Sequence, residues 1–199
     1  MTSILITGGA GDWAKSFQKN HHERFDITTV DRKNLDVTST LCVERYFKNK
    51  QFDIVINNAG SIHPKRVLDT DSQLWINDIN VNLVGTFLIS KSALITNSKT
   101  IIINISSTAA FNVYADWSSY CASKAGVVTL TKCLANDGFQ AYCLCPGAID
   151  TKFRNKFNLS NDNVMNCDQV SQYVLAIINR KYTSGDVLFF RKNEFKLNP

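Results

Sequence analysis

Two residues near the middle of the chain have the types and spacing of a proton-transfer pair. Tyr120 and Lys124 lie four positions apart, so on a helix both side chains project from one face. A free phenol has a pKa near ~10 and is a poor base at neutral pH, but a neighbouring ammonium favours the phenolate and should lower that pKa. Tyr120 could then give a proton to a carbonyl or take one from an alcohol. Ser107 ends an apolar run and could hydrogen-bond the same substrate oxygen.

A glycine-rich loop near the N-terminus could hold phosphates. Gly8, Gly9 and Gly11 follow a short apolar run and open a helical pattern, so the backbone can approach a pyrophosphate at a helix N-terminus. Asp12 and Trp13 begin that helix and belong to the predicted cofactor site. The Asp12 carboxylate is unfavourable near a pyrophosphate unless it points away or caps the helix. Such a loop alone is a weak signal, because strand-to-helix turns also use glycine for steric reasons.

The chain also has a candidate for cofactor selection. Asp31 lies roughly 20 residues after the loop, where a carboxylate can accept from both ribose hydroxyls of a dinucleotide. This position favours NAD(H), while the adjacent Arg32 leaves NADP(H) possible because it could accommodate a 2′-phosphate. The alternative is that Asp31, Arg32 and Lys33 form a solvated loop.

Composition excludes several classes of protein. The 199 residues carry a formal charge of +5, but the basic residues are scattered, so we expect no nucleic-acid partner. No uninterrupted apolar run approaches the ~18–20 residues of a membrane span, and no signal-peptide pattern is present. The six cysteines and three histidines lack metal-ligand spacing, so no metal is expected. We interpret the cysteines as small buried hydrophobes in a reducing compartment, which predicts a cytoplasmic protein.

Strand-like and helical patterns alternate along the chain, which predicts an α/β fold. We expect a Rossmann-like, doubly wound parallel sheet flanked by helices, in a single domain over residues 1–199. A strand at 34–37 would leave too few residues after Asp31 for a crossover helix. Predicted strands cover 3–7, 25–31, 34–37, 52–57, 100–106, 141–145 and 186–190. Predicted helices cover 13–21, 72–95, 118–134 and 168–179. A further helix is expected to follow Thr38, which would cap it, and to end near residue 50.

Seven motifs in order then identify a resemblance. They are Thr7-Gly8-Gly9-Ala10-Gly11, Asp36-Val37, Asn57-Asn58-Ala59-Gly60, Asn80-Val81-Asn82-Leu83, Asn104-Ile105-Ser106-Ser107, Tyr120-Cys121-Ala122-Ser123-Lys124 and Pro146-Gly147. The chain resembles a shortened member of the short-chain dehydrogenase/reductase family over nearly its whole length. In that family the serine stands where Ser107 does, thirteen residues before the tyrosine.

The resemblance implies roles for these residues. Ser107, Tyr120 and Lys124 would be catalytic, Lys124 would also bind the nicotinamide ribose, and Asn82 would anchor a proton-relaying water; the alternative for Asn82 is an ordinary helix residue. Further cofactor contacts would come from Asp36 and Val37 at the adenine, from Asn58, Ala59 and Gly60 at the adenosine ribose, and from Pro146, Gly147, Ile149 and Thr151 at the nicotinamide. The partner would be a small-molecule substrate.

The resemblance also implies a homodimer or homotetramer, formed through the helices at 72–95 and 118–134. The apolar side chains on these helices include Trp75, Ile79, Phe87, Val127 and Leu130, some of which must face the sheet.

The predicted activity is an NAD(P)-dependent hydride transfer on a small or sugar-like carbonyl or alcohol. Two alternatives stay open: an NAD-using epimerase or dehydratase, and a non-catalytic dinucleotide-sensing or scaffold protein. In the most common short form of the family the second glycine falls at the position of Asp12; here it is Gly11, a spacing closer to the sugar-nucleotide-modifying branch. His63, Phe111, Trp117 and Phe153 could line a substrate pocket, although the substrate itself is not readable from the sequence.

Overall fold

A seven-stranded sheet forms the centre of the molecule. The computed structural model describes residues 1–155 and 162–199. The strands lie in the order β2-β1-β3-β4-β5-β6-β7, and every neighbouring pair is parallel except β6–β7, which is antiparallel. Their bounds are β1 (Ser3–Thr7), β2 (Asp26–Val30), β3 (Ile54–Asn57), β4 (Ile101–Ile105), β5 (Ala141–Pro146), β6 (Val187–Arg191) and β7 (Glu194–Leu197). This architecture confirms the predicted α/β fold.

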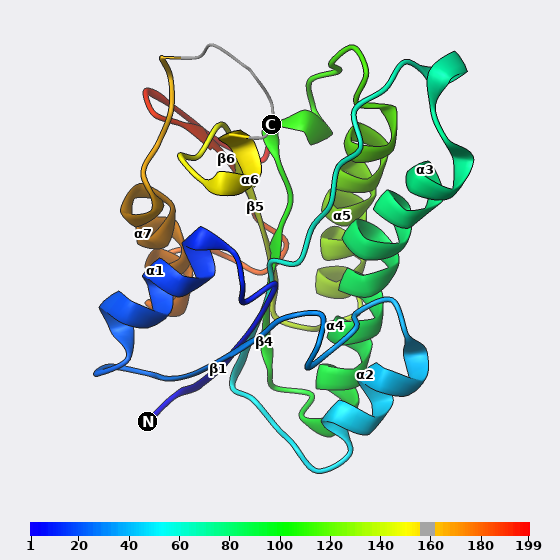
Figure 1. The fold of residues 1–199 in the computed structure, drawn as a ribbon. Helices are drawn as coiled ribbons and strands as arrows, with labels where there is room; N and C mark the ends of the chain where they lie inside the picture. The colour runs from blue at the N-terminus through cyan, green and yellow to red at the C-terminus, as the bar shows by residue number, and fades with distance from the viewer. Residues whose placement is uncertain (156–161) are drawn as a thin grey trace.

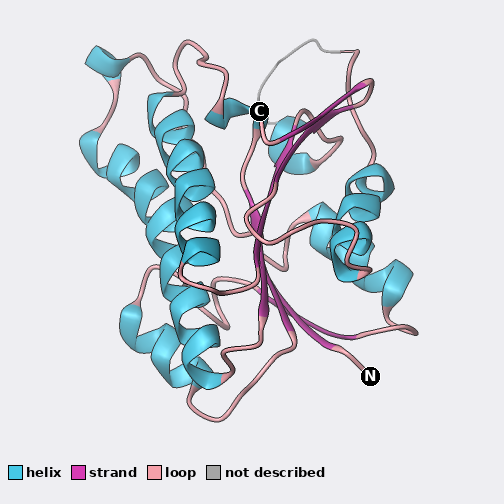
Figure 2. Ribbon diagram, turned by 180° about the vertical axis from the view of Figure 1, so that it is seen from behind, coloured by secondary structure: helices cyan, strands magenta, loops and turns pink. Residues whose placement is uncertain are grey.

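Helices cover both faces of the sheet (Figures 1 and 2). On one face lie α1 (Asp12–His21) and α7 (Cys167–Ile178), whose buried side chains, such as Phe17 and Val174, join the core with Ile4 and Ile6. The other face carries α2 (Thr40–Phe47), α3 (Ser72–Ile79), α4 (Gly85–Thr96) and α5 (Ser118–Asn136). Short elements complete the described chain: η1 (Val67–Asp69), the π-helix η2 (Asn80–Val84), η3 (Thr108–Ala110) and α6 (Lys152–Asn155).

The predicted strand at 34–37 is wrong. This segment is a turn, in which the backbone N–H groups of Asn34 and Leu35 donate to the Asp31 carbonyl oxygen at 3.1 and 2.9 Å. Leu35 and Val37 are nevertheless buried, and this alternation has the period of a strand. The turn needs no crossover helix, so the short spacing after Asp31 presents no difficulty.

Two further expectations about local structure need correction. The cap of α2 is Ser39, whose hydroxyl accepts from the Cys42 N–H at 3.3 Å, whereas the Thr38 hydroxyl donates to Asp36 at 2.7 Å. The strand β7 was not expected, because the exposed charged residues of Glu194–Leu197 give little hydrophobic pattern. Its antiparallel pairing with β6 makes it the last strand of the sheet.

The cysteines are free, but the prediction that they are buried holds for only part of the set. Cys143 and Cys145 are fully buried, Cys133 is exposed, and Cys42, Cys121 and Cys167 are half-buried.

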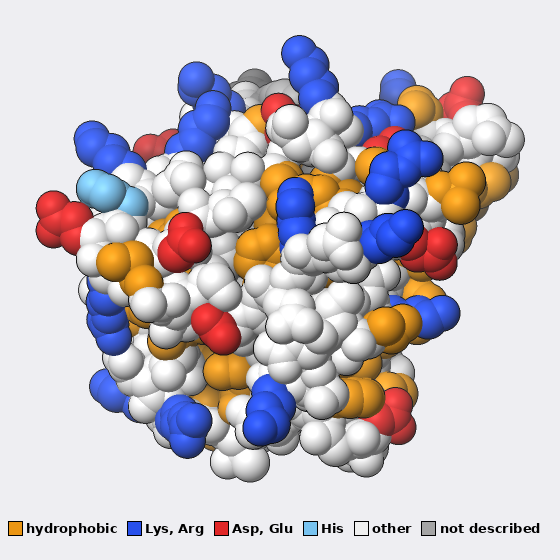
Figure 3. All heavy atoms as spheres, turned by 90° about the horizontal axis from the view of Figure 1, so that it is seen from below, with side chains coloured by type: hydrophobic (Ala, Val, Ile, Leu, Met, Phe, Trp, Pro, Cys, Tyr) orange, Lys and Arg blue, Asp and Glu red, His pale blue; other side chains and the backbone are white. Residues whose placement is uncertain are grey.

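Among the described residues, one helical stretch is long and apolar enough by composition to cross a membrane. It spans Ser72–Thr96, which is α3, η2 and α4 taken together. In the fold, α4 packs on β3 and α2, and its Ile89 and Ala93 belong to the core. On the face shown in Figure 3, basic side chains are scattered among acidic and neutral ones and do not gather into a patch.

Candidate active site

The loops that follow β1, β3, β4 and β5 meet at the carboxyl edge of the sheet, where parallel α/β folds place their sites. Hydrogen bonds of Thr7 and Asn58 hold the loop after β1 against the loop after β3. The Thr7 hydroxyl accepts from the backbone N–H groups of Asn58 and Ala59, both at 3.1 Å. The Asn58 side chain donates back to the Thr7 carbonyl at 3.0 Å. The glycine loop is therefore fixed against the turn after β3.

The glycine loop has a shape that requires glycine. Gly8 adopts a φ of +68°, and a Cβ there would stand 2.9 Å from the Ala59 Cα. A Cβ on Gly9 would stand 2.8 Å from the Val30 nitrogen. Gly11 is the N-cap of α1, and a Cβ there would meet the Gly8 carbonyl oxygen at 3.2 Å and nothing else within 4 Å. The outer side of the loop is thus open at a helix N-terminus, which fits a diphosphate.

The structure resolves the position of Asp12. Its carboxylate accepts from the Lys152 backbone N–H, across the start of α6, so it neither caps α1 nor faces the glycine loop. The Trp13 side chain is 5% exposed and packs on Phe17 with ring centroids 5.3 Å apart. Its indole N–H is buried without a hydrogen-bond partner among the described residues. Because this ring belongs to the core, the Trp13 side chain does not face the outer side of the glycine loop.

Asp31 and Arg32 lie directly after β2, next to the glycine loop. Asp31 accepts from the N–H groups of Lys33 and Asn34 at 2.9 and 3.2 Å, which fixes its side chain at the strand end. Gly9 lies beside it, since the Gly9 N–H donates to the Val30 carbonyl at 2.8 Å. The Arg32 side chain is 79% exposed.

Asp36 and Val37 follow Asp31 and Arg32 in the chain, and neighbouring residues hold both side chains in place. The Thr38 hydroxyl, and to a smaller extent Arg32, lowers the pKa of the Asp36 carboxyl. Arg32 Nε lies 3.5 Å from Asp36 Oδ2. Val37 packs closely on α4, which begins at Gly85, because a Cβ at Gly85 would stand 2.7 Å from Val37 Cγ2. Arg32 is therefore drawn towards Asp36.

The structure brings Ser107, Tyr120 and Lys124 together. The Ser107 hydroxyl is close enough to the Tyr120 phenol to favour its phenolate, and Lys124 Nζ lies 5.5 Å from the Tyr120 ring centroid. Lys124 is 4% exposed, and its ammonium donates to the Ile105 carbonyl at 2.8 Å. The ammonium has three donors, so this bond leaves others for hydroxyl groups of a ligand.

Burial sets the proton affinities of this pair. It lowers the pKa of Lys124 to about 8. It raises the pKa of Tyr120 to about 12, against the opposing effect of the Ser107 hydrogen bond. The expectation that the ammonium lowers the Tyr120 pKa is wrong for the protein alone, because desolvation of the phenolate is the larger effect. At neutral pH the site therefore holds a charged lysine and a protonated tyrosine.

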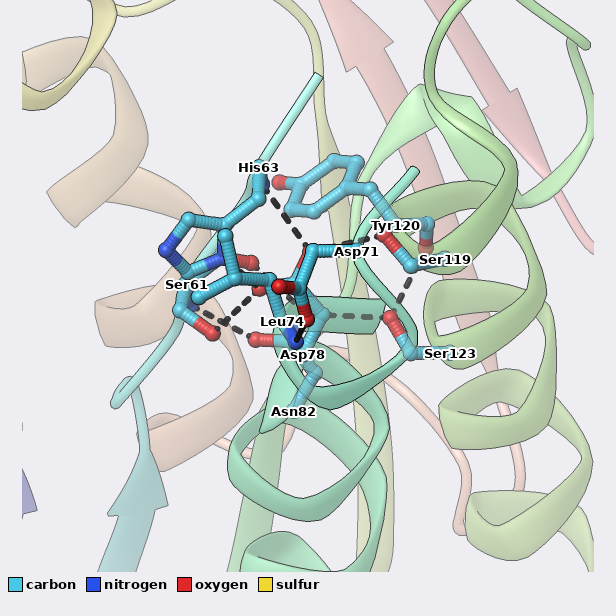
Figure 4. A network of polar contacts seen from close by, with 9 residues as sticks. All are labelled: Ser61, His63, Asp71, Leu74, Asp78, Asn82, Ser119, Tyr120 and Ser123. Atoms are coloured by element: carbon cyan, nitrogen blue, oxygen red, sulfur yellow. Dashed lines mark hydrogen bonds and ion pairs between the residues drawn. The ribbon is translucent and has the colours of Figure 1, made fainter. Parts of the chain in front are cut away.

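Asn82 lies in the π-helix η2 and holds the loop after β3 (Figure 4). Its Oδ1 accepts from the Ser61 N–H at 2.8 Å, and its Nδ2 donates to the Ser61 carbonyl at 2.9 Å and to Ser123 Oγ at 3.0 Å. A Cβ at Gly60 would stand 3.4 Å from Asn82 Oδ1 and 3.9 Å from Lys124 Nζ. Gly60 thus leaves an open approach to the lysine.

Asp78 is a site residue that the sequence did not reveal. It is 0% exposed, and four donors face its carboxylate: the hydroxyls of Ser61 and Ser119 at 2.8 and 2.7 Å, and the backbone N–H and Nδ1 of His63 at 2.9 and 2.7 Å (Figure 4). It ties the loop after β3 to the residue before Tyr120. Its partners are far away in sequence, so no local pattern could have indicated it.

The segment after β5 contains the last group of predicted cofactor residues. Pro146 ends the strand, and the Gly147 N–H donates to the Phe190 carbonyl at 2.8 Å. Ile149 pairs with Met165 in a short parallel bridge, and the Thr151 hydroxyl accepts from the Arg154 N–H at 3.3 Å. The segment therefore lies along the end of β6, on the same edge as Ser107.

A cavity of about 480 Å³ opens at this edge. Of the four residues proposed for a substrate pocket, none is among its described lining. Phe111 instead stacks edge-on against Phe189 at 5.9 Å, and His63 bonds Asp78. The lining comprises Thr108, Asn112, Val113, Tyr114, Gly147, Ala148, Asn163 and Arg191. Across residues 1–155 and 162–199, no group of three His, Cys, Asp or Glu side chains could hold a metal ion.

Comparisons with known proteins point to one family. The family model for short chain dehydrogenases matches residues 4–162. A 2-dehydro-3-deoxy-D-gluconate 5-dehydrogenase of Bacillus subtilis is 37% identical over 134 residues, which are 64% of this chain and 52% of that protein. An uncharacterised oxidoreductase of Staphylococcus aureus (strain MRSA252) is 32% identical over 152 residues, 70% of this chain and 66% of the other. The match thus spans about half to two thirds of the length of these relatives.

Solved structures share the fold at low sequence identity. A 3-ketoacyl-(acyl-carrier-protein) reductase from Brucella melitensis, complexed with NADH, superposes with a TM-score of 0.88 at 18% identity, covering 96% of this chain and 97% of the other. A 4-hydroxyisoleucine dehydrogenase complexed with NADH gives 0.84 at 20% identity, covering 96% of each chain. With a family model that spans most of the sequence and motifs that converge on one edge of the sheet, this chain belongs to the short chain dehydrogenase family.

Proposed function

We propose that the protein is an NAD(P)-dependent oxidoreductase that interconverts an alcohol and a carbonyl on a small or sugar-like molecule. The observation that carries the proposal is the convergence of Ser107, Tyr120 and Lys124 beside the open approach at Gly60. A bound nicotinamide would supply or accept the hydride. A scaffold protein without catalysis would have no need to bury an ammonium at this cost.

The residues of the chain would handle the proton and the orientation. In reduction the Tyr120 phenol gives its proton to the carbonyl oxygen as the carbon gains a hydride; in oxidation the phenolate takes the hydroxyl proton back. Ser107 holds the substrate oxygen at the phenol. Lys124 uses its remaining donors on the ribose hydroxyls, and Asn82 keeps the loop at Ser61 clear of that space. The role of Asn82 in anchoring a relay water is part of the same proposal.

The adenosine end favours NAD(H) over NADP(H). The Asp31 carboxylate is fixed at the end of β2, where it would repel a 2′-phosphate. Arg32 is engaged by Asp36, which supports the same preference. The other contacts expected from the family resemblance, at Val37, Asn58, Ala59 and the segment 146–151, complete the proposed cofactor site.

The chain is proposed to work as a homodimer or homotetramer in the cytoplasm. Exposed apolar residues on α3, η2 and α4 support assembly: Leu74, Ile76 and Phe87 are each 44% exposed. Val127 is fully buried against the sheet, so it is not part of such an interface. Free thiols throughout the chain are typical of a reducing compartment.

A screen of carbonyls and alcohols, read by nicotinamide absorbance with both cofactors, tests the activity. Turnover that disappears in Tyr120→Phe is expected. Co-purified cofactor that does not exchange, with inversion of a substrate centre and no net oxidation, would instead indicate an epimerase. Dinucleotide binding without any turnover would favour the sensor alternative.

A further inference from the structure

The cavity at the carboxyl edge of the sheet has one charged side chain among its described lining residues, Arg191. Arg191 is the last residue of β6, and its stem lies across Gly147: a Cβ built on that glycine would stand 2.8 Å from Arg191 Cγ. The cavity is bordered on another side by Thr108, the residue after Ser107. A molecule in the cavity therefore lies between the Ser107 end of β4 and the guanidinium at the end of β6.

The guanidinium is not neutralised by its surroundings. Its carboxylate neighbour Glu194 lies 3.4 Å from Arg191 Nη1, but Glu194 lies closer to Lys196, at 2.8 Å from Nζ. The Lys196 hydrogen bond is also the main reason that the pKa of Glu194 is lowered. Two cations thus share one carboxylate, and the cluster keeps a net positive charge. The Arg191 guanidinium further lies 5.2 Å from the Phe189 ring centroid, which holds it in place.

The β6–β7 hairpin explains how this charge reaches the cavity. Arg191 and Glu194 pair directly across the antiparallel strands, so both side chains are fixed at the hairpin end. An arginine offers five donors in a planar fork that matches a carboxylate. The long ion pair to Glu194 uses one nitrogen, which leaves donors for a ligand.

We propose that Arg191 binds the carboxylate of the substrate, and that the protein therefore acts on a small hydroxy acid or the corresponding oxo acid. This inference rests on the proposed oxidoreductase function and names its substrate class. The reacting carbon lies at Ser107 and Tyr120, and the acid group lies at Arg191, across the cavity. A neutral substrate that filled the same space would desolvate the guanidinium without pairing it, and would bind more weakly for that reason.

Matched substrate pairs test the proposal. D-gluconate, 3-hydroxybutyrate and lactate are each compared with their primary amides, with NAD⁺ and NADP⁺, in wild type, Arg191→Gln and Lys192→Gln. Lys192 is the adjacent exposed cation outside the described lining of the cavity, so its variant controls for net charge. For an acid that is turned over, Arg191→Gln should lower kcat/KM about ten- to hundred-fold, the loss expected for a hydrogen bond to a charged group, while the amide changes little. Lys192→Gln should leave both unchanged.

Melting temperatures with NADH bound give a readout that needs no turnover. The acids should raise the melting temperature of wild type more than the amides do, and Arg191→Gln should remove that difference while keeping its own unliganded melting temperature. Equal rates or equal shifts for acids and amides would overturn the inference, as would an equal loss for both in Arg191→Gln. If amides are turned over and acids are not, the oxidoreductase proposal stands and the acid inference fails. If neither this panel nor the screen of carbonyls and alcohols gives turnover, the oxidoreductase proposal fails, and the melting shifts alone decide whether Arg191 binds carboxylates.

Discussion

Burying the Lys124 ammonium should make the stability of the protein depend on pH in a way that one substitution removes. Lys124→Met keeps the length of the stem and deletes the charge. The fall in the pKa of Lys124 from 10.5 to about 8 corresponds to about 3 kcal/mol at neutral pH. That cost applies below pH 8, where both folded and unfolded chains carry the proton.

The sign follows from the protons bound. Between pH 8 and 10.5 the unfolded chain still holds the lysine proton and the folded chain does not, so the free energy of unfolding rises with pH in this window. From pH 7 to pH 9.5 the rise due to Lys124 should be about 2 kcal/mol. The methionine variant lacks this contribution, whereas the other titrating groups are common to both proteins and largely cancel.

Urea unfolding at pH 7 and pH 9.5 measures the difference between the two proteins at each pH. Wild type should gain about 2 kcal/mol relative to Lys124→Met on going to the higher pH. At pH 7 the variant should be close to wild type, because relief of the buried charge is offset by about 1–3 kcal/mol for the Ile105 carbonyl that loses its donor. An identical pH dependence in the two proteins would refute the reasoning.

Three further outcomes are expected. Tyr120→Phe should reduce turnover by about 10²–10⁴-fold while a fluorescence titration shows unchanged NADH binding, because the phenol oxygen serves the proton transfer alone; wild-type turnover would disprove the mechanism. Asp31→Asn should weaken the preference for NAD(H) over NADP(H) by about 1–3 kcal/mol in paired titrations, and tighter binding of NADP(H) by wild type would contradict the assignment. Asp78→Asn turns an acceptor into a donor opposite Ser119 or His63, so it should lower the free energy of unfolding by about 1–3 kcal/mol in urea and reduce kcat more than NADH binding; an unchanged stability would mean that the four bonds are dispensable.

Much of the fold and part of the site could be predicted from local pattern. Parallel strands read as apolar runs because both faces are covered, as in β3, whose four residues are all buried. Tyr120 and Lys124 share one helix, so their spacing alone places them together. The turn at 34–37 was mistaken for a strand because Leu35 and Val37 are buried in alternation, and burial pattern does not report hydrogen bonding.

The parts that could not be predicted depend on contacts across the sheet. Asp78 gains its importance from side chains 15, 17 and 41 positions away. Arg191 reaches the cavity because a hairpin of exposed residues pairs at the sheet edge, and because Gly147 leaves room for its stem. The sequence contains these residues, but it does not show that the fold brings them close to their partners.

The π-helix in the middle of the long stretch Ser72–Thr96 has a consequence for how that stretch tolerates insertions and deletions. Asp78, Asn82, Thr86 and Ser90 are all buried polar residues at intervals of four, and they lead from the site to the interior, where Ser90 accepts from Asn57 at 2.9 Å. In a regular α-helix each interval of four overshoots a full turn by about 40°, so such a row would spiral away from the sheet. The wider turn at Asn80–Val84 takes up this drift and keeps the row facing inward. Deleting one residue there would restore a regular helix in which Asp78 and Ser90 are still about three turns apart, so both ends of the row could stay buried, whereas a deletion within Gly85–Ser90 would rotate Asp78 by about 100° relative to Ser90.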